Sequence, residues 1–126
     1  MSRRIHVEQL AFTLVETMIV VAIVGLLAVL AVPSFVKARK QSEGRRAIND
    51  ARVEDAAISQ WALETGQADG DAVNTTDAAT YLKTAWKTKD VLGHAYKFGK
   101  VGTQQVLIAA STKKELANVG IDWGPY

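Results

Sequence analysis

The sequence predicts an α+β protein in which a long N-terminal helix packs against a small C-terminal cap that contains a β-hairpin. Three observations lead to this prediction: an apolar run between Ala11 and Val36, an amphipathic helical pattern after it, and two strand-like segments near the C-terminus. The chain has 126 residues, which is typical of a single domain. Its composition divides it into a polar leader (1–11), a hydrophobic helix (12–36), an amphipathic helix (37–65) and the cap (66–126).

The hydrophobic segment is long enough to cross a membrane. About 20 apolar residues span a bilayer as a helix, and between Ala11 and Val36 the only charged residue is Glu16. Gly25 and Pro33 lie inside this segment. Because proline lacks an amide donor and glycine costs a helix about 1 kcal/mol relative to alanine, both residues are predicted to weaken the helix locally.

Residues 37–65 are predicted to continue the helix beyond the membrane. At the helical period, one face gathers small and apolar side chains, namely Ala47, Ile48, Ala51, Ile58, Trp61 and Ala62. Gly66 is the predicted stop. A cap of about 60 residues buries little core by itself, so we expect this face to hold the cap.

The cap is predicted to contain a short helix or turn and then a hairpin. The segment "TTDAATYLKTAWK" has a Thr/Asp start typical of a helix. The segments "HAYKFGKV" and "QQVLIAAS" alternate as strands do, and Gly102 and Thr103 lie between them. Trp61, Trp86 and Trp123 are expected to pin the cap to the helix.

No catalytic residue, metal or cofactor is predicted, and the chain is not expected to be an enzyme. It has no cysteine, which excludes disulfides, thiolate metal sites and a cysteine nucleophile. Its two histidines are His6 and His94, and neither belongs to a recognisable Ser/His/Asp set. Asp122 alone does not supply the several oxygen ligands that calcium needs.

The stretch "AFTLVETMIVVAIVGLLAVLAVP", from Ala11 to Pro33, resembles the N-terminus of type IV pilins and of type II secretion pseudopilins. The resemblance implies that a prepilin peptidase cuts between Ala11 and Phe12 and methylates the new amine of Phe12. It also implies a single-pass inner-membrane anchor with the cap outside the cytoplasm. An assembly platform in that membrane would then build a homo-polymer or a mixed pilin filament, in the periplasm or at the cell surface.

The same resemblance implies an assembly role for Glu16. A carboxylate in an apolar setting is costly unless it is paired, and in this family it is thought to meet the amine of a neighbouring subunit, here Phe12. The alternative is an acid that lies near the headgroups and is favoured by the helix dipole. For Gly25 and Pro33, the resemblance implies a region that loses helical hydrogen bonds in the filament, and the alternative is a static kink.

A basic cluster follows the hydrophobic segment. Its members are Lys37, Arg39, Lys40, Arg45 and Arg46. By the positive-inside rule this flank would stay cytoplasmic, whereas the pilin resemblance implies that it faces outward. A solvated helix surface is the expected role, contact with acidic groups of neighbouring subunits is an alternative, and nucleic acid is not an expected partner at a net charge of only +2.

Two other functions compete with a filament subunit. One is an exported soluble binding module with an ordinary signal peptide cleaved near Ala31, because Val29 and Ala31 satisfy the small-residue rule. The other is a plain single-span anchored protein that does not assemble. The sequence does not separate a pilus from a secretion pseudopilus, nor a major from a minor subunit.

Overall fold

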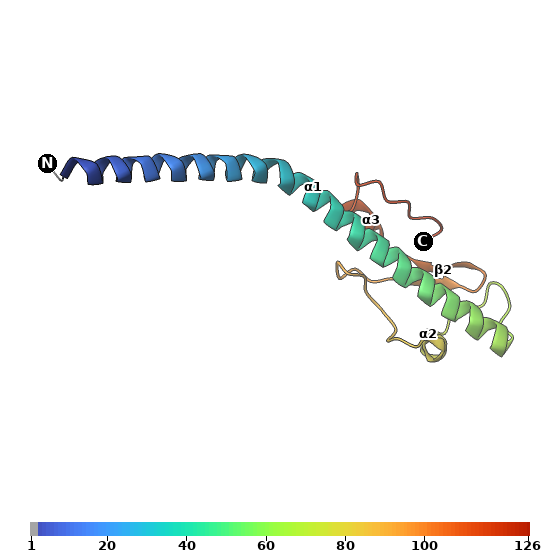
Figure 1. The fold of residues 1–126 in the computed structure, drawn as a ribbon. Coiled ribbons are helices and arrows are strands. Elements are labelled where there is room, and N and C mark those ends of the chain that lie inside the picture. Colours follow the sequence, from blue (N-terminus) through green and yellow to red (C-terminus); the bar gives the residue numbers. More distant parts are fainter. Residues whose placement is uncertain (1–2) are drawn as a thin grey trace. The chain divides into compact units, whose positions relative to one another are not determined.

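The computed structural model describes the backbone of residues 3–126 and the side chains from Thr13 onward. The elements follow one another in a simple order (Figure 1). They are α1 (Arg3–Thr65), α2 (Thr75–Ala78), the 3-10 turn η1 (Ala79–Tyr81), β1 (Lys97–Lys100), β2 (Thr103–Leu107) and α3 (Ala110–Glu115). The chain forms two compact units, Met1–Ala38 and Arg39–Tyr126. The α+β class predicted from the sequence is confirmed.

In the first unit, α1 presents large apolar side chains on every side. The residues from Leu14 to Val36 include fifteen such side chains that are 45–70% exposed. By length and composition, α1 is long and apolar enough to cross a membrane. It runs through Gly25 and Pro33 as one helix, and their predicted weakening of the helix stays a prediction.

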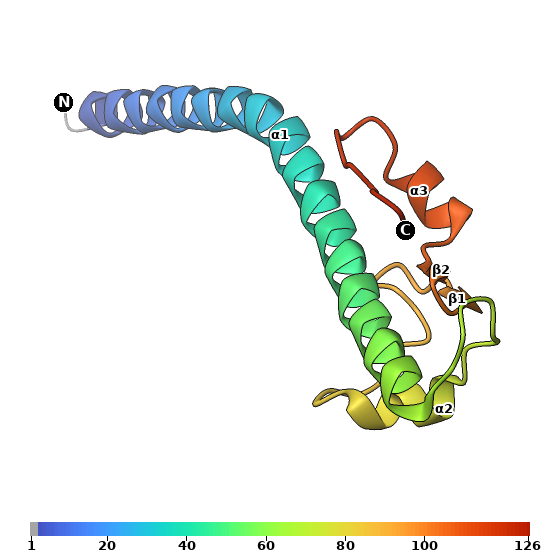
Figure 2. The same ribbon diagram turned by 90° about the vertical axis from the view of Figure 1, so that its right-hand side faces the viewer.

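In the second unit, the outer part of α1 carries the core. The six side chains predicted for its apolar face are all buried. They contact buried residues of the cap, which are Ala78, Tyr96, Val101, Val106 and Ile108, and Figure 2 shows the hairpin and α2 beside this part of the helix. Alanines at 47 and 51 leave room for the cap to approach, and the Tyr96 hydroxyl donates a hydrogen bond to the Ala47 carbonyl at 3.3 Å.

The cap begins with the predicted short helix. The Asn74 side chain accepts hydrogen bonds from the backbone amides of Thr76 and Asp77, which satisfies the free donors at the start of α2. The helix ends earlier than the sequence segment suggested, because Leu82 is already extended. Trp61 is buried, whereas Trp86 and Trp123 are only partly buried against the core.

The predicted hairpin is present as the antiparallel pair β1 and β2. Phe98 pairs with Val106, and the register shifts between Phe98 and Lys100. Gly99 lies at this bulge, where an added Cβ would overlap the backbone of Gln104. The expected extent of the second strand was wrong, because the strand ends at Leu107 and Ala110 begins α3. This helix was missed because it has only six residues and no side-chain cap.

Glu54 holds the segment around Lys87 against α1 through a hydrogen bond. Its side chain is 2% exposed, and its Oε1 atom accepts a hydrogen bond from the Lys87 backbone amide at 2.8 Å. The Lys87 ammonium pairs with Asp50 Oδ1 at 2.6 Å. Burial raises the pKa of Glu54 from 4.5 to about 7, and the nearby charge of Asp50 adds to this effect.

The raised pKa of Glu54 predicts a specific pH dependence of stability. The folded state holds the Glu54 proton more tightly than the unfolded state, so the free energy of unfolding is highest below the unfolded pKa of 4.5 and falls as the pH rises to about 7. This loss corresponds to about 3 kcal/mol. Glu54→Gln should abolish it, as measured by urea unfolding of the full chain in detergent, followed by tryptophan fluorescence from pH 4.5 to 8.

Glu64→Gln is the matched control, because Glu64 lies on the same helix and is exposed. That variant should keep the wild-type pH dependence. Equal pH profiles for Glu54→Gln and the wild type would contradict the raised pKa.

Candidate functional site

Glu16 is the predicted assembly residue whose side chain the structure describes. It is exposed on α1, and it is the only ionisable group between Thr13 and Val36. The neighbouring Thr17 hydroxyl donates to the Thr13 carbonyl at 2.8 Å, so Thr17 is satisfied within its own helix. The side chains of Ala11 and Phe12 lie outside the described residues. Glu16 follows Phe12 by four residues, which is about one helical turn.

A shallow apolar groove lies on the face of α1 opposite Glu16. It is lined by Leu14, Thr17, Met18, Val21 and Ala22. The smaller Thr17 and Ala22 side chains lie between larger ones, which hollows the helix surface at this point. Such relief is what a second helix needs in order to pack closely in an apolar medium.

Four of the five members of the basic cluster are exposed, and Lys40 is partly buried. Arg45 and Arg46 are exposed. Arg39 Nε pairs with Glu43 Oε1 at 2.9 Å, with the Arg39 side chain 71% exposed. An exposed pair one turn apart contributes only about 0.3–0.5 kcal/mol. The cluster therefore adds charge to the surface and little stability.

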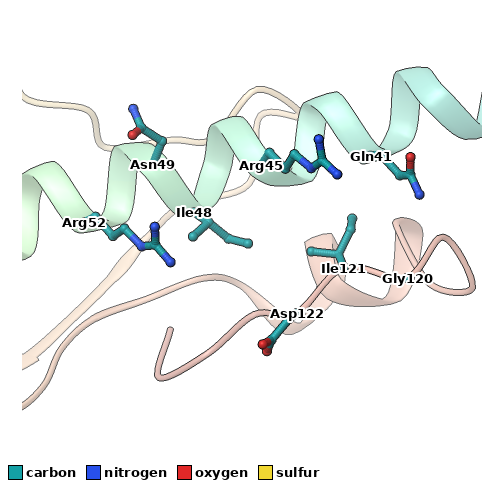
Figure 3. A pocket seen from close by; sticks show the side chains of 8 residues that line it. All are labelled: Gln41, Arg45, Ile48, Asn49, Arg52, Gly120, Ile121 and Asp122. Atoms are coloured by element: carbon teal, nitrogen blue, oxygen red, sulfur yellow. The ribbon is translucent and has the colours of Figure 1, made fainter.

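A cleft of about 410 Å³ lies between α1 and the C-terminal segment (Figure 3). Its lining residues are Gln41, Arg45, Ile48, Asn49, Arg52, Gly120, Ile121 and Asp122. Gln41 Nε2 donates to the Val119 carbonyl at 2.7 Å and closes one end. Arg45, Arg52 and Asp122 are all exposed, so water already solvates the charges of this cleft.

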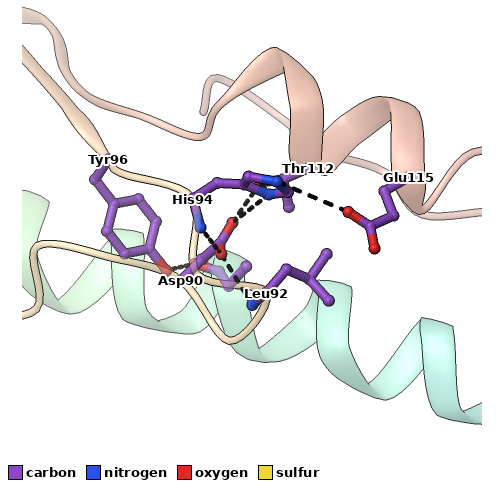
Figure 4. Close-up of polar contacts among 7 residues, drawn as sticks. Asp90, Leu92, His94, Tyr96, Thr112 and Glu115 are labelled. Carbon is purple, nitrogen blue, oxygen red and sulfur yellow. Dashed lines mark hydrogen bonds and ion pairs between the residues drawn. The ribbon is translucent and has the colours of Figure 1, made fainter.

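A cluster of polar side chains links the segment before β1 to α3 (Figure 4). Asp90 is 8% exposed, and its Oδ1 atom accepts from the backbone amides of Leu92 and His94, both at 2.9 Å. Its Oδ2 atom accepts from the Thr112 hydroxyl. The His94 Nδ1 atom lies 3.0 Å from the Thr112 Oγ1 atom, and the His94 Nε2 atom lies 3.8 Å from Glu115 Oε2.

This acid, imidazole and hydroxyl do not form a catalytic triad. In a triad the imidazole accepts the hydroxyl proton, but here Thr112 gives its proton to Asp90. His94 Nδ1 must then donate to the Thr112 oxygen, and Thr112 is fully buried. The cluster is a structural clasp, which agrees with the structural role expected for His94. No group of three potential metal-binding side chains exists among the described residues.

The clasp predicts that removing the Thr112 hydroxyl group lowers the stability of the fold strongly. Thr112→Val keeps the shape of the side chain but leaves Asp90 Oδ2 without its donor in a buried site, so the free energy of unfolding should fall by about 2–3 kcal/mol. Ser111→Ala, at the exposed neighbouring position, should change it by less than about 0.5 kcal/mol. Urea unfolding of the full chain in detergent measures both, and equal effects of the two variants would contradict the clasp.

Comparison with known proteins supports the pilin resemblance. The chain is 34% identical over 96 residues to a fimbrial protein of Neisseria meningitidis serogroup B. The matched region covers 76% of this chain and 55% of the relative, so the chain spans about half the length of that protein. No protein-family model and no solved structure matches the chain.

The name of the relative describes a structural protein and not an enzyme, in agreement with the prediction that this chain is not an enzyme. The long apolar α1 also fits a pilin. The chain is thus similar in sequence to a fimbrial protein, in agreement with the pilin resemblance of its N-terminal segment.

Proposed function

We propose that this chain is a structural subunit of a pilus-like filament and that it polymerises through the N-terminal part of α1. The exposed apolar surface between Leu14 and Val36 carries the proposal. Side chains of this kind need a bilayer or other apolar helices around them, because an exposed patch of this extent is rare on a soluble monomer. A membrane before assembly and a filament core after it would cover the same surface in turn.

Processing is the first step of the proposed function. A prepilin peptidase cuts between Ala11 and Phe12 and methylates the Phe12 amine. The chain is then held in the inner membrane by a single span, with the cap outside the cytoplasm. The assembly platform draws it from there into a periplasmic or cell-surface filament. The name of the relative favours a pilus over a type II secretion pseudopilus.

Glu16 sets the register between subunits in this proposal. Apolar helices can slide past one another at little cost, whereas an unpaired carboxylate among them is costly. A cationic amine on Phe12 of the neighbouring subunit removes that cost at one axial position only.

The processing step predicts the mass of the mature protein. Intact-mass measurement should find a chain that begins at Phe12 and carries one additional methyl group. A chain that begins at Val32 would instead establish an ordinary signal peptide, with cleavage after Ala31, and overturn the proposal. An uncut chain would leave a plain membrane anchor.

The register role predicts that filaments depend on the charge of Glu16. Glu16→Ala should lower the yield of filaments sheared from cells by at least tenfold, about 1.4 kcal/mol per subunit contact, while the amount of membrane-bound chain is unchanged. Ser34→Ala is the matched control, because it removes an exposed polar side chain of the same apolar segment that does not line the groove. Electron microscopy and immunoblotting measure both quantities, and an unchanged filament yield for Glu16→Ala would exclude the register role.

A further inference from the structure

A cavity of about 300 Å³ lies between α1 and the segment that precedes β1. We call it the Glu54 cavity; its lining residues are Asn49, Asp50, Val53, Glu54, Leu82, Thr84, Ala85 and Lys87. Its volume is at the lower end of the range for small-molecule sites, about 300–1,000 Å³. A space of this size suits the end of one long side chain.

The polar groups of the Glu54 cavity are incompletely paired. Glu54 Oε1 accepts from the Lys87 backbone amide, but Glu54 Oε2 is buried and has no hydrogen-bond partner. The Lys87 ammonium is engaged by Asp50. Glu54 therefore has no cationic side chain of its own chain bonded to it, and its Oε2 atom is left without a partner. Buried polar atoms are nearly always paired in native structures, so this oxygen points to a missing donor.

The residues that line the cavity indicate the chemical class of the missing donor. Val53, Leu82 and Ala85 supply apolar surface suited to an aliphatic stem, and Glu54 and Asp50 supply the anionic end. A lysine or arginine side chain has both features. Arginine fits better, because a guanidinium can bond two acceptor atoms at once and is less strongly hydrated than an ammonium.

The chain itself carries suitable arginines in its basic cluster. Arg45 and Arg46 are exposed and take part in no ion pair among the described residues. Each copy therefore displays an unused cation and contains a buried carboxyl oxygen that has no partner. Copies that are brought together by their N-terminal helices would present one to the other at high effective concentration.

We propose that the Glu54 cavity receives an arginine of the basic cluster from a second copy of the chain. This contact rests on the proposed filament and adds a link between caps to the contact between N-terminal helices. The guanidinium donates to Glu54 Oε2 and stabilises the ionised form of this carboxyl group. Removing one partner of such a buried pair leaves an uncompensated charge, so the contact is specific for the correct neighbour.

Cysteine cross-linking of assembled filaments tests the contact. The chain has no cysteine, so introduced thiols react without background. Ala85→Cys marks the rim of the cavity, and Ser42→Cys marks the helix surface one turn before Arg45 and Arg46; all these positions are exposed. The double variant, treated with a short bis-maleimide in intact filaments, should give a ladder of covalent multimers on a denaturing gel.

The matched control is Ala72→Cys combined with Ser42→Cys, because Ala72 is also an exposed alanine but does not line the cavity. It should give at least tenfold less multimer. In the cavity pair, adding Glu54→Gln, or Arg45→Gln with Arg46→Gln, should reduce the ladder to the control level. Lys114→Gln, which changes an exposed charge outside the cluster, should leave it intact.

The outcomes separate this contact from the proposed function. If filaments form but the cavity pair gives no more multimer than the control, the cavity contact is wrong and the filament proposal stands. A ladder that survives both charge-removing changes would also overturn the contact. If the wild-type chain forms no filaments, the proposed function fails and the contact fails with it.

Discussion

Burial of one face of α1 is the interaction on which the cap depends. The cap has a two-stranded sheet and three short helical segments, and an isolated hairpin is at best marginally stable in water. The face between Ala47 and Ala62 supplies the missing half of the core. Its alanines allow close approach, while Ile48, Ile58 and Trp61 supply the larger apolar side chains. The cap therefore cannot be treated as a module that folds apart from this helix.

Two buried carboxyl groups hold the loops of the cap that the core packing does not fix. Asp90 gathers two backbone amides and the Thr112 hydroxyl, and so ties the approach to β1 to α3. Glu54 holds the backbone of Lys87 against α1. The difference between them is informative. Both Asp90 oxygens have hydrogen-bond donors, whereas one Glu54 oxygen has none. The unpaired Glu54 oxygen is therefore the atom that we propose binds a second copy of the chain.

The first unit differs from the cap in what stabilises it. Between Thr13 and Val36 its helix has no polar face, and the large apolar side chains of this stretch are exposed. Such a segment is stable only in an apolar medium or among its own copies. In that setting Glu16 is the group for which position along the axis matters most. The proposed function assigns the contact strength to the apolar side chains and the register to this one carboxylate.

The sequence by itself determined the α+β class, the apolar face of the outer helix, the hairpin and the resemblance to pilins. These follow from periodicity, turn residues and a local motif, which are written in consecutive residues. It failed to predict α3, because that helix has no cap signal. The His94 clasp and the Glu54 cavity were also beyond it. Thr112 lies 22 residues from Asp90, and Lys87 lies 33 residues from Glu54. Only the tertiary structure decided that these residues meet, because their proximity comes from the way the cap wraps around α1 and leaves no trace in local sequence.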